Sequence, residues 1–487
     1  MYTQHQKRQK TYGGRQTPVT DSYEFFPGVT RVEYRPGASA EDSLCFRHYN
    51  PSERVHGRTM EEWFRPAVSY WHAFSYQGLD RYGMPAFIRP WDEAPNSLEA
   101  CKRRVRAAFE FFSKLGVRYW TVFDRDLTPE GYTLEESFQQ LDEVIDLVQE
   151  LQQRTGIKPL WFGCNLFSHP RSYGESHAHQ RWYANGAATN PDAHVAAYAA
   201  AQCKKAFDIA MKLGAENFLL WGAREGYHNP MVADLPREMR NYAKFLKIVA
   251  DYKDKHGFRG NLLIRPGPHR ESRFYNSEHR YESEDCDTFG RYDYDAMSTL
   301  CLLKHHGLER QFKLHVYPGR DHLFASAMGY LGCIEYESYH EEYFGDFRYN
   351  GETTVMMKNF IDQASVSSTD SEYDEFQGGI QPGGVSLALR PRRESHDFRD
   401  LFLMYVQSLD TLAKGLKTAV RLTSEGHFSR HLQQRYSGYQ SGIGARLASG
   451  EASLEECDEF VKRHGEPNPP SARLEHWNSV FRYYNEH

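Results

Sequence analysis

The sequence predicts a (β/α)8 barrel followed by a C-terminal helical extension. Short apolar runs rich in β-branched and aromatic residues alternate with longer amphipathic stretches over roughly 250 residues, which is typical of a parallel sheet with crossover helices. The number of these units and the length of 487 residues favour a closed barrel. The alternative is an open doubly wound sheet, which usually has a GxGxxG fingerprint after its first strand, and this chain has none.

Hydrophobic spacing places the alternating elements along the chain. Leu141, Val144, Ile145, Val148 and Leu151 recur at helical spacing and predict one apolar face on a helix at 133–155. The apolar run at 118–123 fits a buried strand of a parallel sheet. On the same grounds we expect further helices at 100–115, 194–213, 240–256 and 294–306, and further strands at 159–162, 217–221, 261–264 and 312–316.

Beyond about residue 391 the pattern changes to helices alone. Helices are expected at 397–422, 453–464 and 472–484, and Ser453 and Glu456 have the spacing of a capping box. This stretch is too poor in strands to form a sheet of its own. We therefore expect a basic tail at 1–20, a barrel at 21–390 and a helical extension at 391–487 that contacts another subunit.

Composition argues against several classes of protein. The formal net charge is −6, whereas a nucleic-acid-binding chain is usually basic. No run of about 18 apolar residues is present to cross a membrane. The eight cysteines include no CxxC pair, which argues against a disulfide framework and favours a reducing cytoplasm. The first twenty residues are basic and contain no acid, so a mitochondrial transit peptide is the alternative.

Several motifs have an order and spacing typical of one enzyme family. They are EFFPG at 24–28, YWHAF at 70–74, FDRD at 123–126, NLFSHPR at 165–171, WGAREGY at 221–227 and DTLAKGLK at 410–417. Together they resemble xylose isomerase of the longer, class II type, over about 21–487. The resemblance implies a TIM barrel, usually assembled as a tetramer, that isomerises an open-chain sugar with the help of two divalent cations. The chain departs from the family by an insertion at 172–182.

Most positions at which the resemblance implies metal ligands carry other residues. The replaced ligands are now Arg265, Tyr317, Arg320, Arg348 and Ala388. Only Glu335 and Asp346 keep a carboxylate at such a position. An arginine cannot bind a metal ion, and two carboxylates are too few for the oxygen cage that a hard cation requires. We therefore expect the protein to use no metal cofactor.

The positions at which the resemblance implies catalytic groups are also altered. Phe123 stands in place of the ring-opening histidine, although its partner carboxylate survives as Asp126. Gly267 stands in place of a lysine that hydrogen-bonds the substrate carbonyl. Aromatic remnants of the sugar pocket are kept at Trp161 and Trp221, and Tyr82 lies where a neighbouring subunit usually inserts a phenylalanine.

Three functions fit these observations. The one we favour is an inactive scaffold, a homo-oligomer (tetramer or dimer) or a subunit of a larger assembly. The second is a barrel that binds an anionic sugar, a phosphate or an acid, through arginine. Its candidate residues are Arg265, His269, Arg270, Arg320 and Arg348, unless these arginines simply pair with leftover acids such as Asp126 and Glu335. The third is an active metal-dependent isomerase that converts D-xylose to D-xylulose, with ligands relocated to His177 and His179.

Overall fold

The fold is described from a computed structural model. It describes residues 23–78, 87, 89–92, 97–167, 182–267, 290–337, 354–361 and 380–486. The predicted tail at 1–20, most of the insertion at 172–182, and the candidate residues Tyr82, His269, Arg270, Asp346 and Arg348 lie outside these residues.

The described strands close into a barrel in which every neighbouring pair is parallel. In order around the barrel they are β3 (Ala67–Ser69), β4 (Tyr119–Phe123), β5 (Lys158–Cys164), β6 (Asn217–Trp221), β8 (Asn261–Arg265), β10 (Phe312–Val316), β11 (Leu331–Glu337) and β12 (Val385–Ala388), which pairs again with β3. The prediction of a (β/α)8 barrel is confirmed. The open doubly wound sheet is excluded because the sheet has no free edge.

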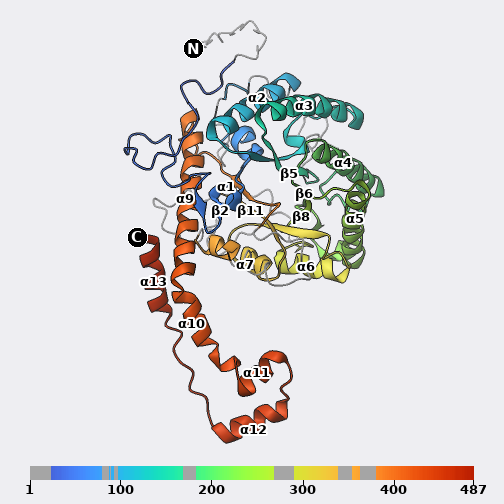
Figure 1. The fold of residues 1–487 in the computed structure, drawn as a ribbon. Helices are drawn as coiled ribbons and strands as arrows, with labels where there is room; N and C mark the ends of the chain where they lie inside the picture. The colour runs from blue at the N-terminus through green and yellow to red at the C-terminus, as the bar shows by residue number, and fades with distance from the viewer. Residues whose placement is uncertain are drawn as a thin grey trace, which may run out of the picture.

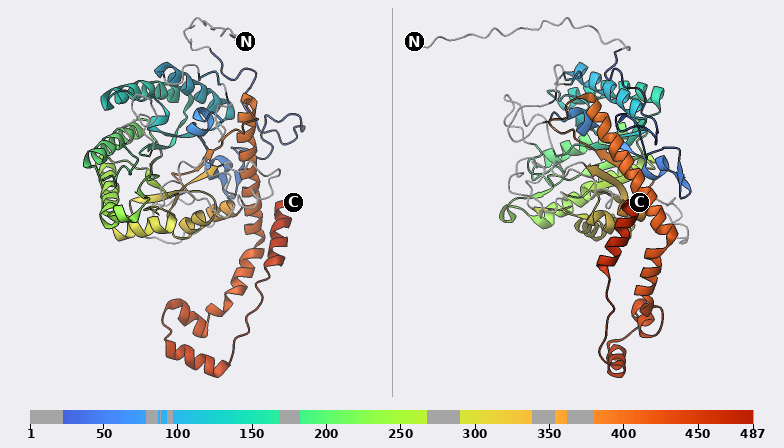
Figure 2. Two further views of the ribbon diagram at one scale, coloured as in Figure 1. Left: turned by 180° about the vertical axis from the view of Figure 1, so that it is seen from behind. Right: turned by 90° about the vertical axis from the view of Figure 1, so that its left-hand side faces the viewer.

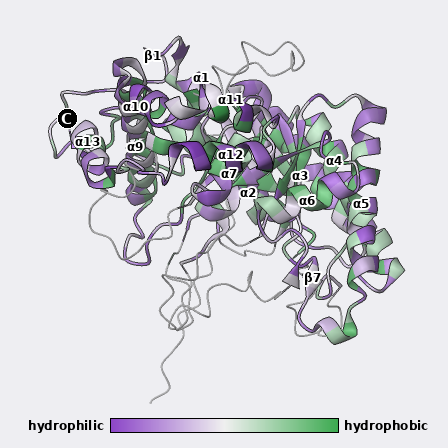
Figure 3. Cartoon of the chain, turned by 90° about the horizontal axis from the view of Figure 1, so that it is seen from below, coloured by the Kyte–Doolittle hydropathy of each residue, from purple (hydrophilic) through white to green (hydrophobic). Residues whose placement is uncertain are grey.

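A ring of helices surrounds the barrel (Figure 1). The ring consists of α2 (Leu98–Leu115), α3 (Leu134–Thr155), α4 (Ala193–Lys212), α5 (Leu235–His256), α6 (Ala296–His305) and α7 (Arg320–Ala327). Hydrophilic and hydrophobic residues lie side by side on these helices (Figure 3), as expected when one face packs on the sheet and the other meets water. The bounds of α2, α3, α4 and α6 agree with the predicted helices to within about two residues. α5 begins earlier than predicted, at Leu235, because Asp234 caps its first turn by accepting from the backbone N–H of Arg237. The short helix α7 was not predicted.

Small elements complete the two ends of the barrel. Before the barrel lie β1 (Arg54–Val55), β2 (Arg58–Thr59) and α1 (Met60–Phe64). The loops that follow β6 and β8 pair with one another through β7 (Gly226–Tyr227) and β9 (Gly290–Arg291), which are antiparallel. The pairing of β7 with β9 holds Arg291 beside the end of β8.

The C-terminal region begins with a long helix on the barrel and then leaves it. α9 (Phe398–Glu425) buries Phe402, Tyr405 and Leu409 in the same core as the ring helices. Figure 1 and Figure 2 show the next helices extending away from the barrel, and the last helix returning beside α9. These helices are α10 (His427–Arg435), α11 (Gly442–Ser449), α12 (Leu454–His464) and α13 (Leu474–Glu486). The predicted capping box at Ser453 is confirmed.

Across the described residues, none of the helices combines the length and the apolar character needed to cross a membrane.

Candidate active site

The carboxyl ends of the parallel strands all face one end of the barrel, where the active sites of this fold lie. We call this end the mouth. Phe123 ends β4, Trp221 ends β6, Arg265 ends β8, Tyr317 follows β10, and Glu335 lies on β11 near its end. Barrel closure therefore brings together residues that are more than 200 positions apart in the chain.

One side of the mouth is a cluster of aromatic rings, which we call the aromatic wall: Phe123, Trp161, Phe167 and Trp221. The ring of Phe123 lies 5.1 Å from that of Trp161 and 6.3 Å from that of Trp221, and the rings of Phe167 and Trp221 are 4.4 Å apart. The wall depends on Gly163, because a Cβ atom there would lie 2.7 Å from ring atoms of Phe123. Both tryptophan rings therefore pack on Phe123. That Trp161 and Trp221 line a sugar pocket stays a prediction.

Arg265 crosses the mouth as a buried, stacked cation. Its guanidinium lies 4.2 Å from the ring centroid of Trp221 and 5.0 Å from that of Tyr317. Its Nη1 atom is 3.3 Å from Oε1 of Glu335. A position that the resemblance assigns to a metal ligand thus carries a fixed positive charge with a carboxylate partner.

Glu335 has a second partner, His315, which the sequence analysis did not single out. The Nε2 atom of His315 is 2.9 Å from Oε2 of Glu335. Burial raises the pKa of Glu335, but Arg265 and the hydrogen bond from His315 outweigh burial, so the net pKa lies well below the usual range. Burial lowers the pKa of His315, and Glu335 only partly offsets it. Glu335 is therefore an anion beside a neutral imidazole.

Gly267, at the position of the expected lysine, has no room for a side chain. A Cβ atom would lie 2.8 Å from the carbonyl oxygen of Tyr294 and 3.1 Å from Nε of Arg291. Arg291 is held there because its Nη2 and Nε atoms donate to Oδ1 of Asp293 at 2.9 and 3.1 Å. Arg291, further along the same loop after β8, therefore fills the space in which a lysine would stand.

The described residues do not fit a pair of divalent cations. They contain no group of three or more His, Cys, Asp or Glu side chains that could hold a metal ion. Glu335 is already engaged by Arg265 and His315, and the buried Ala388 has no donor atom. Asp346 and Arg348 lie outside the described residues, so they do not enter this comparison of the described side chains with a metal site.

Of the candidate arginines, Arg265 and Arg320 lie within the described residues. Arg320 opens α7 as an exposed side chain, and its Nη2 atom lies 3.5 Å from the sulfur of Met297. The expected pairing of an arginine with a leftover acid is present for Arg265 and Glu335, whereas Asp126 has no arginine partner in the described chain. Arg265 is thus already neutralised, which weakens the case for an anionic ligand.

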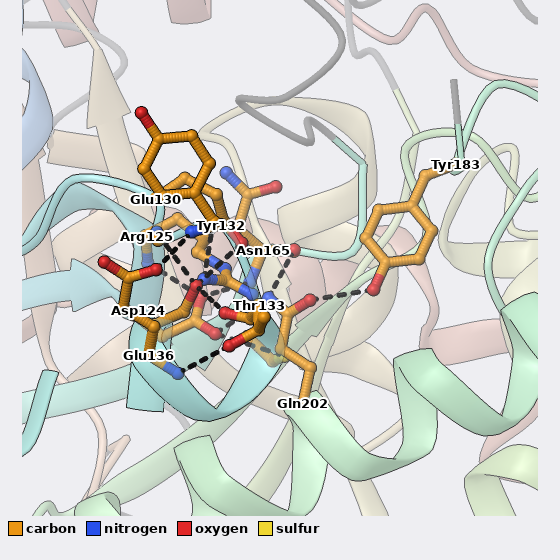
Figure 4. Close-up of polar contacts among 12 residues, drawn as sticks. Asp124, Arg125, Glu130, Tyr132, Thr133, Glu136, Asn165, Tyr183 and Gln202 are labelled. Carbon is orange, nitrogen blue, oxygen red and sulfur yellow. Dashed lines mark hydrogen bonds and ion pairs between the residues drawn. The ribbon is translucent and has the colours of Figure 1, made fainter. Parts of the chain in front are cut away.

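A buried polar network braces the outer side of the mouth (Figure 4). Asp124 accepts from the backbone N–H of Asn165 at 2.8 Å and from Nε2 of Gln202 at 2.8 Å. The hydroxyl of Tyr183 donates to Oε1 of Gln202 at 2.7 Å, and Arg125 pairs with Glu130 at 2.6 Å. Burial raises the pKa of Asp124, although Arg125 and these donors oppose it. The network joins the segments that directly follow β4 and β5 to α4, and none of the motifs in the sequence predicted it.

Asp126 lies in the short turn that follows β4. Its Oδ2 atom accepts from the backbone N–H of Phe123 at 3.1 Å, and the side chain is partly exposed. Burial against the barrel raises the pKa of Asp126 to about 7; Asp124 adds to this shift, while the Phe123 N–H and Arg104 oppose it. This carboxyl therefore changes its charge near neutral pH.

Comparison with known proteins shows relatives along nearly the whole chain. The xylose isomerase of Arabidopsis thaliana is 36% identical over 468 residues, which cover 94% of this chain and 90% of that protein. The xylose isomerase of Enterococcus faecalis is 35% identical over 472 residues, which cover 94% of this chain and 99% of that protein. A family model described as the XylA2 C-terminal domain matches residues 432–484.

These relatives correct two expectations. The interpretation as an inactive scaffold is wrong, because the full-length relatives are named for an isomerase and fit the alternative of an active enzyme better. The expectation that the protein has no metal cofactor is contradicted by the same relationship, since the resemblance to this family implies divalent cations. Both expectations came from single positions, whereas the relationship covers 94% of the chain. By this relationship, the chain belongs to the xylose isomerase family.

Proposed function

We propose that the protein is an aldose–ketose isomerase, with an aldopentose such as D-xylose as its substrate and the ketose D-xylulose as its product. One observation carries the proposal: the chain is 36% identical to a protein named xylose isomerase along 94% of its own length. The barrel supports it, because the mouth combines an aromatic wall with a few polar groups, the usual composition of a small-molecule site.

The chain's own residues bind and orient the sugar. The aromatic wall offers Trp221 as a half-buried, flat apolar surface for the C–H face of a sugar and keeps water away from it. Arg265 supplies N–H donors that stay in place, because the rings of Trp221 and Tyr317 and the carboxylate of Glu335 hold its guanidinium. Its remaining N–H groups suit hydroxyl and carbonyl oxygens of the substrate. The described residues do not fit two divalent cations, so no step is assigned to a metal ion.

Turnover of D-xylose tests this function. The purified full-length protein is treated with EDTA, and ketose formation is measured without added cation and with Mg²⁺, Mn²⁺ or Co²⁺. Ketose is expected in at least one condition, and Trp221→Ala should raise KM by about tenfold because part of the apolar surface is lost. A matched control is Tyr23→Ala, since Tyr23 is an exposed ring that precedes the first strand and lies outside the aromatic wall. Absence of ketose under all four conditions contradicts the proposal.

We also propose that the protein is a cytoplasmic homo-oligomer. The helical extension at 391–487 would form the contacts between its subunits. Its helices beyond α9 expose apolar side chains that a monomer would leave in water. They are Leu432, Tyr436, Tyr439, Leu447, Leu454, Phe460, Val461, Leu474 and Tyr483. Light scattering during size exclusion should give a mass of two or four chains. The charge-introducing variant Leu454→Asp should shift it to a smaller mass, whereas Glu455→Gln, at an exposed neighbouring position, should leave it unchanged. A monomeric wild type contradicts this assembly.

A further inference from the structure

Arg265 has one edge of its guanidinium open at the mouth. Its Nη1 atom faces Oε1 of Glu335, whereas the edge formed by Nε and Nη2 donates to no acceptor in the described part of the chain. The side chain keeps 9% of its surface exposed, and neither Nε nor Nη2 is among the enclosed polar atoms that lack a partner. A ligand at the mouth can therefore reach both N–H groups.

Arg291, which also lies beside the end of β8, has no such open edge. Its Nε and Nη2 atoms donate to Asp293, its Nη1 atom is enclosed, and 1% of its side chain is exposed. The charge of Arg291 is thus used inside the protein, where a substrate cannot reach it. Arg265 differs because its ion pair occupies one edge and leaves the other edge open.

Three contacts hold the open edge in place before any ligand binds. The rings of Trp221 and Tyr317, 4.2 and 5.0 Å from the guanidinium, set its plane, and Glu335 sets its rotation within that plane. Trp221 is also part of the aromatic wall, so the open edge lies next to the surface proposed to bind the sugar. Donors that are already oriented need no reorganisation when charge develops on a bound oxygen.

Conversion of an open-chain aldose to a ketose creates charge on two neighbouring oxygens. The hydrogen on C2 moves to C1 as a hydride, the π electron pair of C1=O1 moves to O1, and the O2–H electron pair forms C2=O2. The proton released from O2 ends on O1, so the sugar as a whole is neither oxidised nor reduced. O1 and O2 share negative charge while the hydride moves. One edge of a guanidinium presents two parallel N–H groups in a plane, which suits two adjacent oxygens.

We propose that Arg265 is a catalytic residue of this isomerase. Its Nε–H and Nη2–H groups donate to O1 and O2 of the open-chain aldose and stabilise the negative charge that these oxygens share during hydride transfer. Arg265 gives up no proton, because a guanidinium stays protonated. The contact strengthens as the charge develops, so it lowers the barrier more than it tightens substrate binding. This inference rests on the proposed isomerase function and adds a residue to it.

The kinetics of Arg265→Lys test this role. Lysine keeps a positive charge opposite Glu335 but replaces the two-pronged edge by a single ammonium group. Under the cation condition that gives most ketose from D-xylose, kcat should fall at least about 100-fold while KM stays within about threefold of wild type. With D-xylose deuterated at C2, the isotope effect on kcat should be at least as large as in wild type, because hydride transfer then limits the rate.

Arg65→Lys is the matched control. Arg65 is also a stacked arginine with an acidic partner, since its guanidinium lies 4.7 Å from the ring centroid of Tyr119 and 2.9 Å from Glu216. It precedes β3, and Glu216 precedes β6, so this pair lies at the opposite end of the barrel from the mouth. Arg65→Lys should therefore change kcat and KM by less than about twofold.

The outcomes separate this inference from the proposed function. An active wild type with an Arg265→Lys kcat within about threefold of it, a change in KM alone, or a slow variant without an isotope effect overturns the role of Arg265 and leaves the isomerase intact. If the wild type forms no ketose with any cation, the proposed function fails and this inference fails with it. Should Arg265→Lys not fold, the double variant Arg265→Met, Glu335→Leu decides, because it leaves no buried charge of this pair. A folded double variant should lose kcat at least about 100-fold, and a retained kcat overturns the role.

Discussion

Arg265 and Glu335 form a buried ion pair, 3.3 Å apart, between two strands that are not neighbours in the barrel. β10 lies between their strands, β8 and β11, and supplies His315 as the second partner of Glu335. The three side chains tie three strands together at the mouth. The guanidinium, the imidazole and the carboxylate thus satisfy one another in a position for which the resemblance implies metal-bound carboxylates.

Removing the carboxylate from this pair should destabilise the protein. Glu335→Gln should lower the free energy of unfolding by about 3 kcal/mol, because it leaves the buried Arg265 without a counter-charge. The double variant Arg265→Met, Glu335→Leu should recover most of this loss, since no buried charge remains. Denaturant unfolding measures both. The control is Asp142→Asn, which breaks the more exposed ion pair of Asp142 with Lys205 and should change the free energy of unfolding by less than about 1 kcal/mol. An equally small effect of Glu335→Gln would refute the prediction.

The ionisation of Asp126 should make stability depend on pH in a defined direction. Its folded-state pKa of about 7 exceeds the unfolded value near 3.9, so the folded state binds this proton more tightly. The resulting stabilisation is complete below about pH 4 and is lost as pH rises through 7. Asp126→Asn cannot ionise, so its stability relative to wild type should increase between pH 4 and 7, by roughly 1–2 kcal/mol after allowance for partial exposure, and stay constant above. Unfolding curves across this range test it; a difference that is independent of pH contradicts the shifted pKa.

The aromatic wall should be sensitive to any side chain at position 163. Gly163→Ala would place a Cβ atom 2.7 Å from the Phe123 ring and 3.2 Å from the carbonyl oxygen of Leu219, and should cost about 2 kcal/mol of stability. Phe123→Leu creates space at the same point and should reduce the cost of Gly163→Ala. A double-mutant cycle measures this coupling as a deviation from additivity. Fully additive effects would show that the two positions do not compete for space.

Restoring a lysine at position 267 should not restore a substrate contact. Gly267→Lys would force its Cβ atom against the Tyr294 carbonyl and the Arg291 side chain, and should lower stability by about 2 kcal/mol without raising kcat. Gly37→Ala is the control, since a Cβ atom at Gly37 would meet nothing within 4 Å, and its effect should stay within about 0.5 kcal/mol. Thermal unfolding and D-xylose turnover measure the two effects. A Gly267→Lys protein of full stability and higher kcat would contradict the structure at Arg291.

Long periodic elements were predictable from the sequence, and short elements were not. The helix at 133–155 and the strand at 217–221 have enough residues for spacing to reveal them, and both are present as α3 and β6. β3 has only three residues, too few to show a period, and it is a strand because β12 and β4 pair with it on either side. α10 was missed because its nine residues bury no apolar face.

Site residues were predictable from the sequence where they stand at a position of a family motif. They were not predictable where only a tertiary contact brings them to the site. Arg265, Glu335 and Phe123 stand at positions that the resemblance picks out. His315 and Arg291 belong to no such position, and only their contacts with Glu335 and Asp293 give them a place in the site. The raised pKa of Asp126 follows from its burial and from Asp124, and not from its position in FDRD.

The sequence alone determined the alternation of strands and helices, the closed barrel and the family, because hydrophobic period and motif order are local properties of the chain. The interpretation as an inactive scaffold was wrong because it judged the function of the whole protein from residues at a few isolated positions. Tertiary structure decided that Arg265 pairs with Glu335 and not with Asp126, and that Arg291 fills the space beside Gly267. The physical reason is barrel closure: it joins distant segments, and only then do burial and neighbouring charges set what each side chain can do.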